Sequence, residues 1–174
     1  MSELKIPAGT GDHIQGDPQA PITLVEYGDY ECPHCGAAYP IVKRVQKHFG
    51  KRMRFVFRNF PLVQAHPNAQ SAAEAAEFAA AQGKFWEMHD AIYEHQQELS
   101  MDFLLRLGEK LGLEGRALAK ALKDEAFAEK VRADFLGGVR SGVNGTPTFF
   151  INGHRHDGPF DYGDLVDGIE EASG

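Results

Sequence analysis

The spacing of the cysteines is the feature that most constrains this chain. The only two cysteines occur in Cys32-Pro33-His34-Cys35, with two residues between them. An apolar run, 22–27, precedes them and a helix-forming run, 37–49, follows, so the pair falls where a strand gives way to a helix. A bond between the two sulfurs would close almost no loop and would constrain the unfolded chain little. We therefore expect the pair to serve chemistry and not stability.

The runs on either side of the cysteines predict a β-α-β unit. Residues 22–27 are apolar on both faces of a strand apart from two polar residues, one of which is Glu26, and this pattern is typical of the middle of a sheet. Glu26 is thus expected to be a buried carboxylate with a perturbed pKa, although an exposed acid at the strand end fits the same sequence. Residues 37–49 have helical spacing, and 53–60 form a second strand that ends at Pro61.

Beyond the second strand, the chain is almost entirely helical for some distance. Runs with helical spacing lie at 69–82, 84–97, 101–111, 114–123 and 126–139. Asn68 and Ser100 are expected to cap two of these helices. No fixed period relates the runs, so they indicate an insertion and not a repeat array.

The C-terminal part of the chain predicts a hairpin and a closing helix. Residues 145–151 are expected to form a short strand that ends in an Asn-Gly turn, with a return strand or its remnant at 154–158. A final helix is expected to begin after Asp161, which is a suitable N-cap.

The predicted fold class is α/β, with a mixed central sheet, helices on both faces and an inserted all-helical subdomain. The first 20 residues, rich in Gly and Pro, indicate an arm with a short edge strand near Ile6 or His13. We expect one domain, 1–174, with its sheet-bearing part at about 20–62 and 140–174 and its helical insertion at about 63–139.

Charge and hydropathy exclude several kinds of partner. The net charge is −7, and no basic run is longer than Lys51-Arg52, which argues against binding to nucleic acid or to an anionic membrane. No apolar run approaches the roughly 20 residues that span a bilayer, so membrane insertion is not expected. The N-terminus has no charged-then-apolar signal region, which favours a cytoplasmic location. A chain whose export signal had been removed would look the same and would act outside the cytoplasm.

The Cys-Pro-His-Cys sequence suits a reactive thiolate. At the first turn of a helix, unpaired N–H groups and the positive dipole end stabilise an anion on Cys32. Cys35, one turn further on, lies on the same face and can close a disulfide with it. Pro33 fits the first turn because its missing N–H would have had no partner. His34 can add a positive charge or a hydrogen-bond donor, although an exposed histidine without a role is the alternative.

A second candidate element precedes the third strand. Pro147 follows Gly145-Thr146, and a cis bond there would expose the backbone of Thr146 to an extended substrate, which could pair with it by strand addition. The sequence alone favours a trans bond, since only about 5–6% of X-Pro bonds are cis.

Three landmarks together resemble the DsbA-like thiol:disulfide oxidoreductases of bacteria. They are Glu26 with the Cys-Pro-His-Cys sequence, the Phe85-Trp86-x-Met88-His89 stretch, and Gly145-Thr146-Pro147-Thr148-Phe149. The resemblance implies a thioredoxin fold with an inserted helical domain, in which Cys32 attacks and Cys35 resolves. It also implies a cis Thr146–Pro147 bond that faces the disulfide, and a buried acid at Glu26 that moves protons to and from Cys35.

The expected activity is thiol–disulfide exchange on protein or peptide substrates, with a redox partner of unknown identity and no cofactor. Two residues favour different kinds of redox activity. His34 favours the thiolate and hence an oxidising disulfide. Thr146 resembles the isomerase branch of the superfamily, whereas the strongest oxidases have valine there.

Two alternatives use the same dithiol without turnover. In the first, both cysteines bind a soft metal, but one C-x-x-C supplies only half of a tetrahedral zinc site. His34, or His154 and His156 near Asp157, could complete such a site, but nothing in the sequence brings them together. In the second, the chain senses redox state. The sequence does not separate that case from an enzyme.

Overall fold

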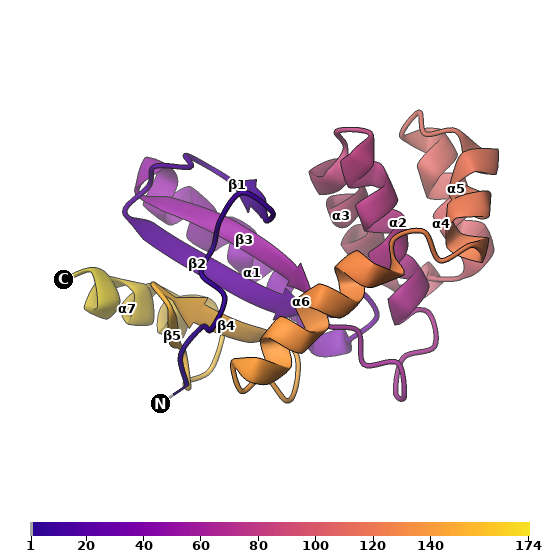
Figure 1. The fold of residues 1–174 in the computed structure, drawn as a ribbon. Coiled ribbons are helices and arrows are strands. Elements are labelled where there is room, and N and C mark those ends of the chain that lie inside the picture. The colour runs from indigo at the N-terminus through magenta and orange to yellow at the C-terminus, as the bar shows by residue number, and fades with distance from the viewer. Residues whose placement is uncertain (1) are drawn as a thin grey trace.

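The computed structural model describes residues 2–174 and contains a five-stranded sheet in the order β1-β3-β2-β4-β5 (Figure 1). The strands are β1 His13–Gln15, β2 Ile22–Gly28, β3 Met53–Asn59, β4 Thr148–Ile151 and β5 His154–Arg155. Neighbours β2 and β3 are parallel, and the other pairs are antiparallel. The mixed sheet predicted from the sequence is therefore confirmed, and β1 is one of its two edge strands, the other being β5.

The helices follow the predicted order. They are α1 Pro33–Phe49, α2 Ala69–Ala81, α3 Phe85–Glu94, α4 Met101–Lys110, α5 Gly115–Lys123, α6 Ala128–Arg140 and α7 Tyr162–Ser173, with short 3₁₀ turns η1 Gly50–Arg52 and η2 Gln96–Glu98. Helix α1 connects the parallel strands β2 and β3, which completes the expected β-α-β unit. Helices α2 to α6 lie between β3 and β4 in the chain, and α2 to α5 form a group at one end of the sheet (Figure 1).

Successive side chains along the strands point to opposite faces of the sheet, and both faces are buried. Leu24 and Phe55 belong to the larger core, together with side chains of α1 and α7. Val25 and Val56, the next residues along the same strands, belong to a smaller core with Phe135 of α6. Both sides of β2 are therefore covered, which accounts for the nearly continuous apolar run in its sequence.

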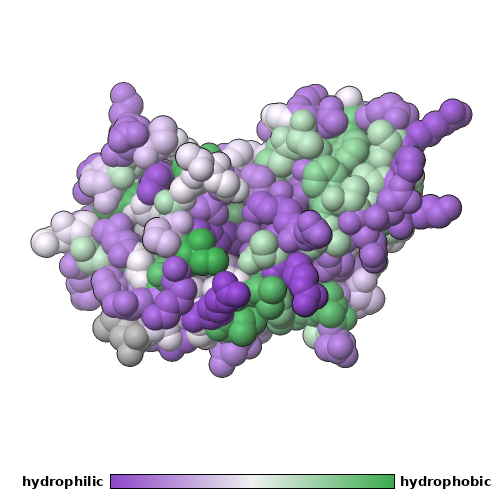
Figure 2. All heavy atoms as spheres, viewed as in Figure 1, coloured by the Kyte–Doolittle hydropathy of each residue, from purple (hydrophilic) through white to green (hydrophobic). Residues whose placement is uncertain are grey.

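Helix α6 approaches the sheet closely because it carries glycines at the contact. A Cβ atom on Gly138 would lie 2.8 Å from the Phe60 ring and 3.0 Å from the Tyr27 ring. Both glycines of the Gly137-Gly138 pair are buried, whereas Leu136 and Val139 beside them are exposed. In Figure 2, apolar side chains gather over α6, and a second apolar area lies at upper right over the group formed by α2 to α5. Helix α6 thus buries one side on the sheet and leaves the other open.

The helical region corrects two expectations. The predicted helix 84–97 ends earlier, at Glu94, and the chain turns so that Gln96 starts a separate 3₁₀ turn. Ser100 caps its helix as predicted, by accepting from the Phe103 N–H, but the side chain of Asn68 does not cap α2. Instead, its amide donates to Glu31 Oε2 at 2.8 Å. The Asn68 side chain therefore bonds to a residue that is distant in the sequence and not to the N–H groups of the first turn of α2.

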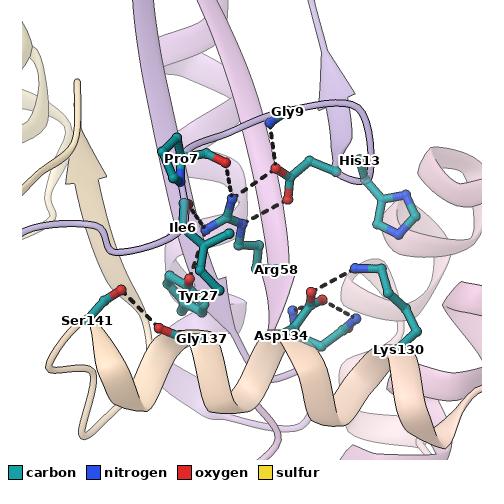
Figure 3. Close-up of polar contacts among 12 residues, drawn as sticks. Ile6, Pro7, Gly9, His13, Tyr27, Arg58, Lys130, Asp134, Gly137 and Ser141 are labelled. Atoms are coloured by element: carbon teal, nitrogen blue, oxygen red, sulfur yellow. Dashed lines mark hydrogen bonds and ion pairs between the residues drawn. The ribbon is translucent and has the colours of Figure 1, made fainter.

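Arg58 fastens the N-terminal arm across β3 (Figure 3). Its guanidinium makes paired contacts with Asp12, from Nε to Oδ1 at 2.8 Å and from Nη2 to Oδ2 at 2.9 Å. It also donates to the carbonyl of Ile6 at 2.8 Å and to the Tyr27 hydroxyl at 2.9 Å. Because Arg58 is 3% exposed, these bonds satisfy a buried charge. They fix the path of the arm along the sheet.

Across residues 2–174, no helix combines the length and the apolar character needed to cross a membrane.

Candidate active site

Cys32 and Cys35 meet at the start of α1, as the sequence predicts. Cys32 is the N-cap of this helix, with an extended backbone at φ −68° and ψ 123°, and Pro33 is its first residue. Cys35 lies within the first turn and is fully buried, whereas Cys32 retains 4% exposure. Both thiols are free. The structure thus places a reduced dithiol where unpaired helix N–H groups stabilise an anion.

The two thiols have opposite tendencies to ionise. A hydrogen bond from the Cys35 thiol, against the opposing effect of burial, lowers the pKa of Cys32 to about 5. The hydroxyl of Thr146 and the backbone N–H groups of Cys35 and His34 lower this pKa further. Burial raises the pKa of Cys35 well above its ordinary value, and its bond to Cys32 and the charge of Glu26 act in the same direction. One sulfur is therefore a thiolate at neutral pH, and the other is a thiol.

Thr146 and Pro147 face the dithiol from the loop before β4. The Cys32 thiol lies 3.5 Å from the carbonyl oxygen of Thr146, to which it donates when protonated. The Thr146–Pro147 peptide bond is cis, as the resemblance implies. The hydroxyl of Thr146 is buried close enough to Cys32 to lower its pKa, although it makes no well-formed hydrogen bond with residues 2–174 in this reduced form. It is thus available to donate to a Cys32 thiolate.

Glu26 is buried, 3% exposed, on the sheet face that α1 covers. Phe57 of β3 and Phe149 of β4 flank it in register on the two neighbouring strands. Burial raises the pKa of Glu26 to about 8, and the charge of Cys32 contributes to the increase. An acid with a pKa close to neutrality next to the dithiol can both give and take a proton.

His34 and Pro33 are exposed beside the buried sulfurs. The backbone N–H of His34 contributes to the low pKa of Cys32. Its imidazole makes no hydrogen bond or ion pair within residues 2–174. The predicted site residues thus fall into two groups. The two cysteines, Glu26, Thr146 and Pro147 are buried or half-buried, whereas Pro33 and His34 are exposed.

Asp29, which the sequence analysis did not single out, organises the loop between β2 and α1. Its Oδ1 accepts from the N–H groups of Glu31 at 2.7 Å and Cys32 at 3.2 Å. Its Oδ2 accepts from the N–H of Leu62 at 2.9 Å and contacts Nδ1 of His66 at 2.7 Å. An Asp three residues ahead of a helix N-cap is a sequence signal for this kind of side-chain turn.

Gln96 is the second residue that the sequence analysis missed. From η2, its amide nitrogen donates to the backbone oxygens of Tyr30 at 2.9 Å and Cys32 at 2.8 Å. Gly36 makes this approach possible, because a Cβ there would lie 2.2 Å from Oε1 of Gln96. The helical region thereby holds the backbone of the attacking cysteine. No local pattern in the sequence marks such a contact.

A polar cavity of about 420 Å³ lies beside the start of α1. Pro33, Gly36 and Ala37 line one side, and the segment 93–98, which includes Gln96, lines the other. Within residues 2–174, no three His, Cys, Asp or Glu side chains gather closely enough to hold a metal ion.

Comparison with known proteins agrees with this geometry. The thioredoxin family model matches residues 9–171. BdbD from Bacillus subtilis, solved in its oxidised form, is 26% identical with a TM-score of 0.88, and the match covers 99% of this chain and 98% of that one. A thioredoxin-like oxidoreductase from Silicibacter pomeroyi is 25% identical with a TM-score of 0.80, over 94% and 93% of the two chains. α-DsbA1 of Wolbachia pipientis, at 22% identity, shares the fold with a TM-score of 0.82, over 98% and 94% of the two chains.

Curated relatives with higher identity are much longer proteins. The Na⁺/H⁺ antiporter NhaA 3 of Salinispora tropica is 48% identical over 86% of this chain but only 23% of its own length. A second antiporter, NhaA 1 of Salinispora arenicola, is 45% identical over 92% of this chain and 24% of its own length. The chain thus spans about a quarter of the curated relatives that it matches.

Proposed function

This chain belongs to the thioredoxin family, as a DsbA-like member, and on that premise we propose that it catalyses thiol–disulfide exchange on protein or peptide substrates through Cys32 and Cys35. The observation that carries the proposal is the asymmetry of the dithiol. Cys32 has a pKa of about 5 at the start of α1, and Cys35 beneath it has a raised pKa. A thiolate nucleophile with a protonated partner is what a two-step exchange requires.

In the first step, the Cys32 thiolate attacks one sulfur of a substrate disulfide. A bond forms between Cys32 and that sulfur, and the other substrate sulfur leaves as a thiolate. Because a low pKa makes Cys32 a good leaving group as well, the reverse of this step is also fast: a substrate thiolate attacks the substrate sulfur of the mixed disulfide and expels Cys32 as a thiolate. Pro33 and His34, exposed beside Cys32, are where a substrate meets the site.

In the second step, Cys35 loses its proton and attacks Cys32. The Cys32–substrate bond breaks, the substrate leaves as a thiolate, and the protein retains the Cys32–Cys35 disulfide. We assign Glu26 to accept the proton of Cys35, and to return it in the reverse direction, since its pKa of about 8 suits both roles. The charge coupling between Glu26 and both cysteines supports this assignment.

Thr146 and Pro147 position the substrate chain in this proposal. The carbonyl of Thr146 lies 3.5 Å from the Cys32 sulfur, so an extended segment that pairs with the Thr146 backbone would bring its own sulfur to Cys32. This mode of binding recognises backbone and thus suits many different polypeptides.

The low pKa of Cys32 favours oxidation of substrates over their reduction. Stabilising the thiolate stabilises the reduced protein and makes its disulfide a stronger oxidant. An oxidising dithiol is useful where disulfides persist, so we favour action outside the cytoplasm over the cytoplasmic location first expected. The transport activity named for the antiporter relatives belongs to those longer proteins and forms no part of the proposal.

Trapping of mixed disulfides tests the assigned roles. The Cys35→Ser variant keeps a hydroxyl that can donate to Cys32, and it should accumulate a covalent adduct with a peptide disulfide through Cys32. The Cys32→Ser variant should form none, because the remaining thiol is buried and protonated. Equal trapping by the two variants would overturn the assignment. A metal-binding alternative predicts instead one tightly held metal per chain after purification without chelator.

A further inference from the structure

One carboxylate connects the attacking cysteine with a histidine 34 positions further along the chain. Asp29 Oδ1 accepts from the backbone N–H of Cys32, while Oδ2 of the same carboxylate contacts Nδ1 of His66. The backbone N–H of Asp29 in turn lies 3.4 Å from the Cys35 sulfur, to which it donates. Asp29 therefore touches both cysteines and His66 at once.

The two members of this pair differ in exposure. The side chain of Asp29 is fully buried, whereas that of His66 is 19% exposed. Besides His66, the carboxylate receives only backbone N–H groups, which cannot change protonation. Among residues 2–174, His66 is thus the one titratable hydrogen-bond partner of the Asp29 carboxylate, and it can exchange a proton with solvent while Asp29 stays in place.

The charges that act most strongly on His66 are negative. They are Asp29, Cys32 and Glu31, and Glu31 is held in place by Asn68, whose N–H donates to Oε1 at 2.7 Å. Burial alone would lower the pKa of His66, but the hydrogen bond to Asp29 and these three charges together raise it. His66 consequently experiences the charge state of Cys32, which changes with oxidation.

We propose that Asp29 and His66 form a positioning pair that fixes the backbone of Cys32 and places a positive charge near its thiolate, with His66 taking up a proton when the dithiol is reduced. The inference rests on the proposed function and adds two residues to it. Neither residue needs to contact the substrate, since the pair acts on Cys32.

The proton count follows from the exchange chemistry. When a substrate dithiol reduces the protein disulfide, the substrate gives up two electrons and two protons and becomes a disulfide. Cys35 keeps one proton, and Cys32 remains a thiolate. Near the midpoint of His66, part of the second proton is bound by His66 and the rest passes to solvent, whereas well above or below that midpoint all of it passes to solvent. Oxidation of the protein reverses each of these changes.

Thermodynamic reciprocity makes the proposal quantitative. If the Cys32 thiolate raises the pKa of His66 by a given amount, then protonated His66 must lower the pKa of Cys32 by the same amount. For groups that share a hydrogen-bonded neighbour, we expect this mutual shift to be about half a unit. A shift of that size corresponds to about a threefold change in the equilibrium constant with glutathione.

Titration of the histidine ring by nuclear magnetic resonance tests the coupling in the unmodified protein. The midpoint of His66 should be higher by about half a unit in the reduced protein than in the Cys32–Cys35 disulfide form. The ring signals of His48, in the last turn of α1, serve as the internal control and should not depend on the redox state. Equal midpoints for His66 in the two redox states would overturn the proposal.

The reciprocal measurement uses His66→Gln, with His48→Gln as the matched control. The pH midpoint for alkylation of Cys32 should rise by about half a unit in His66→Gln and stay unchanged in His48→Gln. An unshifted midpoint in His66→Gln overturns the inference even if exchange with glutathione is normal. If neither the unmodified chain nor any variant exchanges with glutathione, the proposed function fails. In that case, an alkylation midpoint that is shifted in His66→Gln still supports the Asp29–His66 pair.

Discussion

Cys32 and Thr146 are 114 residues apart in the chain, yet the sulfur of one lies 3.5 Å from the carbonyl oxygen of the other. The contact joins the start of α1 to the loop before β4. It exists because β2 and β4 are neighbours in the sheet, with Tyr27 opposite Thr148. The attacking sulfur therefore lies next to a stretch of backbone that precedes a strand, where an extended polypeptide can be aligned.

The hydrogen bond between the two thiols is predicted to be the main cause of Cys32 reactivity. Replacing Cys35 with alanine removes the donor, so the pH midpoint for alkylation of Cys32 should rise from about 5 by one unit or more. Cys35→Ser retains a donor and should stay closer to the unmodified value. Thiolate absorbance against pH measures both. Identical midpoints for the two variants would show that the helix terminus, and not Cys35, sets the pKa.

Gln96 is predicted to matter for activity although it lies outside the sheet region. Gln96→Ala removes two bonds to the loop carbonyls of Tyr30 and Cys32 and should reduce the free energy of unfolding by about 1–2 kcal/mol. The rate of Cys32 alkylation at pH 7 should fall at the same time, because the loop loses its fixed position. Gln97→Ala, at an exposed neighbour, is the control. Denaturant titration and alkylation kinetics would show no difference between the two if the contact were incidental.

Glu26 is predicted to make the protein less stable as pH rises. Its pKa is raised in the folded chain to about 8, from an ordinary value of 4.5. The folded state thus binds more protons between these values, so its stability should fall as pH rises from about 4.5 to about 8 and change little above that. Glu26→Gln should remove part of this pH dependence. At pH 9, its free energy of unfolding, measured by denaturant titration, should exceed that of the unmodified protein by a few kcal/mol at most. It should also slow resolution of mixed disulfides.

The exposed Glu171→Gln is the control for that experiment, since it changes charge without changing burial. If Glu26→Gln retained the full pH dependence, the buried acid would have to be another group. Unchanged resolution kinetics would instead contradict its role with Cys35.

The Asp12–Arg58 pair is predicted to stabilise the fold at neutral pH and to fail in acid. The hydrogen bond and charge of Arg58 lower the pKa of Asp12 below its ordinary value of 3.8, although burial opposes them. The contribution is therefore complete above pH 3.8 and is lost as pH falls through the lowered pKa. Asp12→Asn should cost about 3 kcal/mol or more at pH 7, because it leaves Arg58 buried and unpaired. Asp167→Asn, at an exposed site, should cost little, and a similar loss in both would refute the pairing.

Much of this fold follows from local sequence. The runs at 22–27 and 53–60 become β2 and β3, and the caps Ser100 and Asp161 both accept bonds from N–H groups within their own helices. These features depend on residues a few positions apart, which is the range over which periodicity and capping carry information. The order of the elements then sets which strands can pair.

The parts of the site that the sequence did not predict depend on distant partners. Asp29 bonds to Leu62 and His66, and Gln96 reaches back to Tyr30 and Cys32 across 66 and 64 positions. Nothing in the local sequence distinguishes either residue from other polar residues. Each acquires its role only because the helices pack against the loop between β2 and α1. Asn68 is the N-cap residue of α2, as expected, but its side chain bonds to the distant Glu31 and not to the first turn of the helix.

Equilibration of the unmodified protein with glutathione tests the central claim most directly. With a Cys32 pKa of about 5, between the roughly 7 of thioredoxin and 3.5 of DsbA, the pair should show one two-electron transition between about −270 and −120 mV. Mass spectrometry of acid-quenched samples would then find an intramolecular Cys32–Cys35 disulfide in the oxidised form. Failure to form that disulfide at any ratio of reduced to oxidised glutathione would contradict the account.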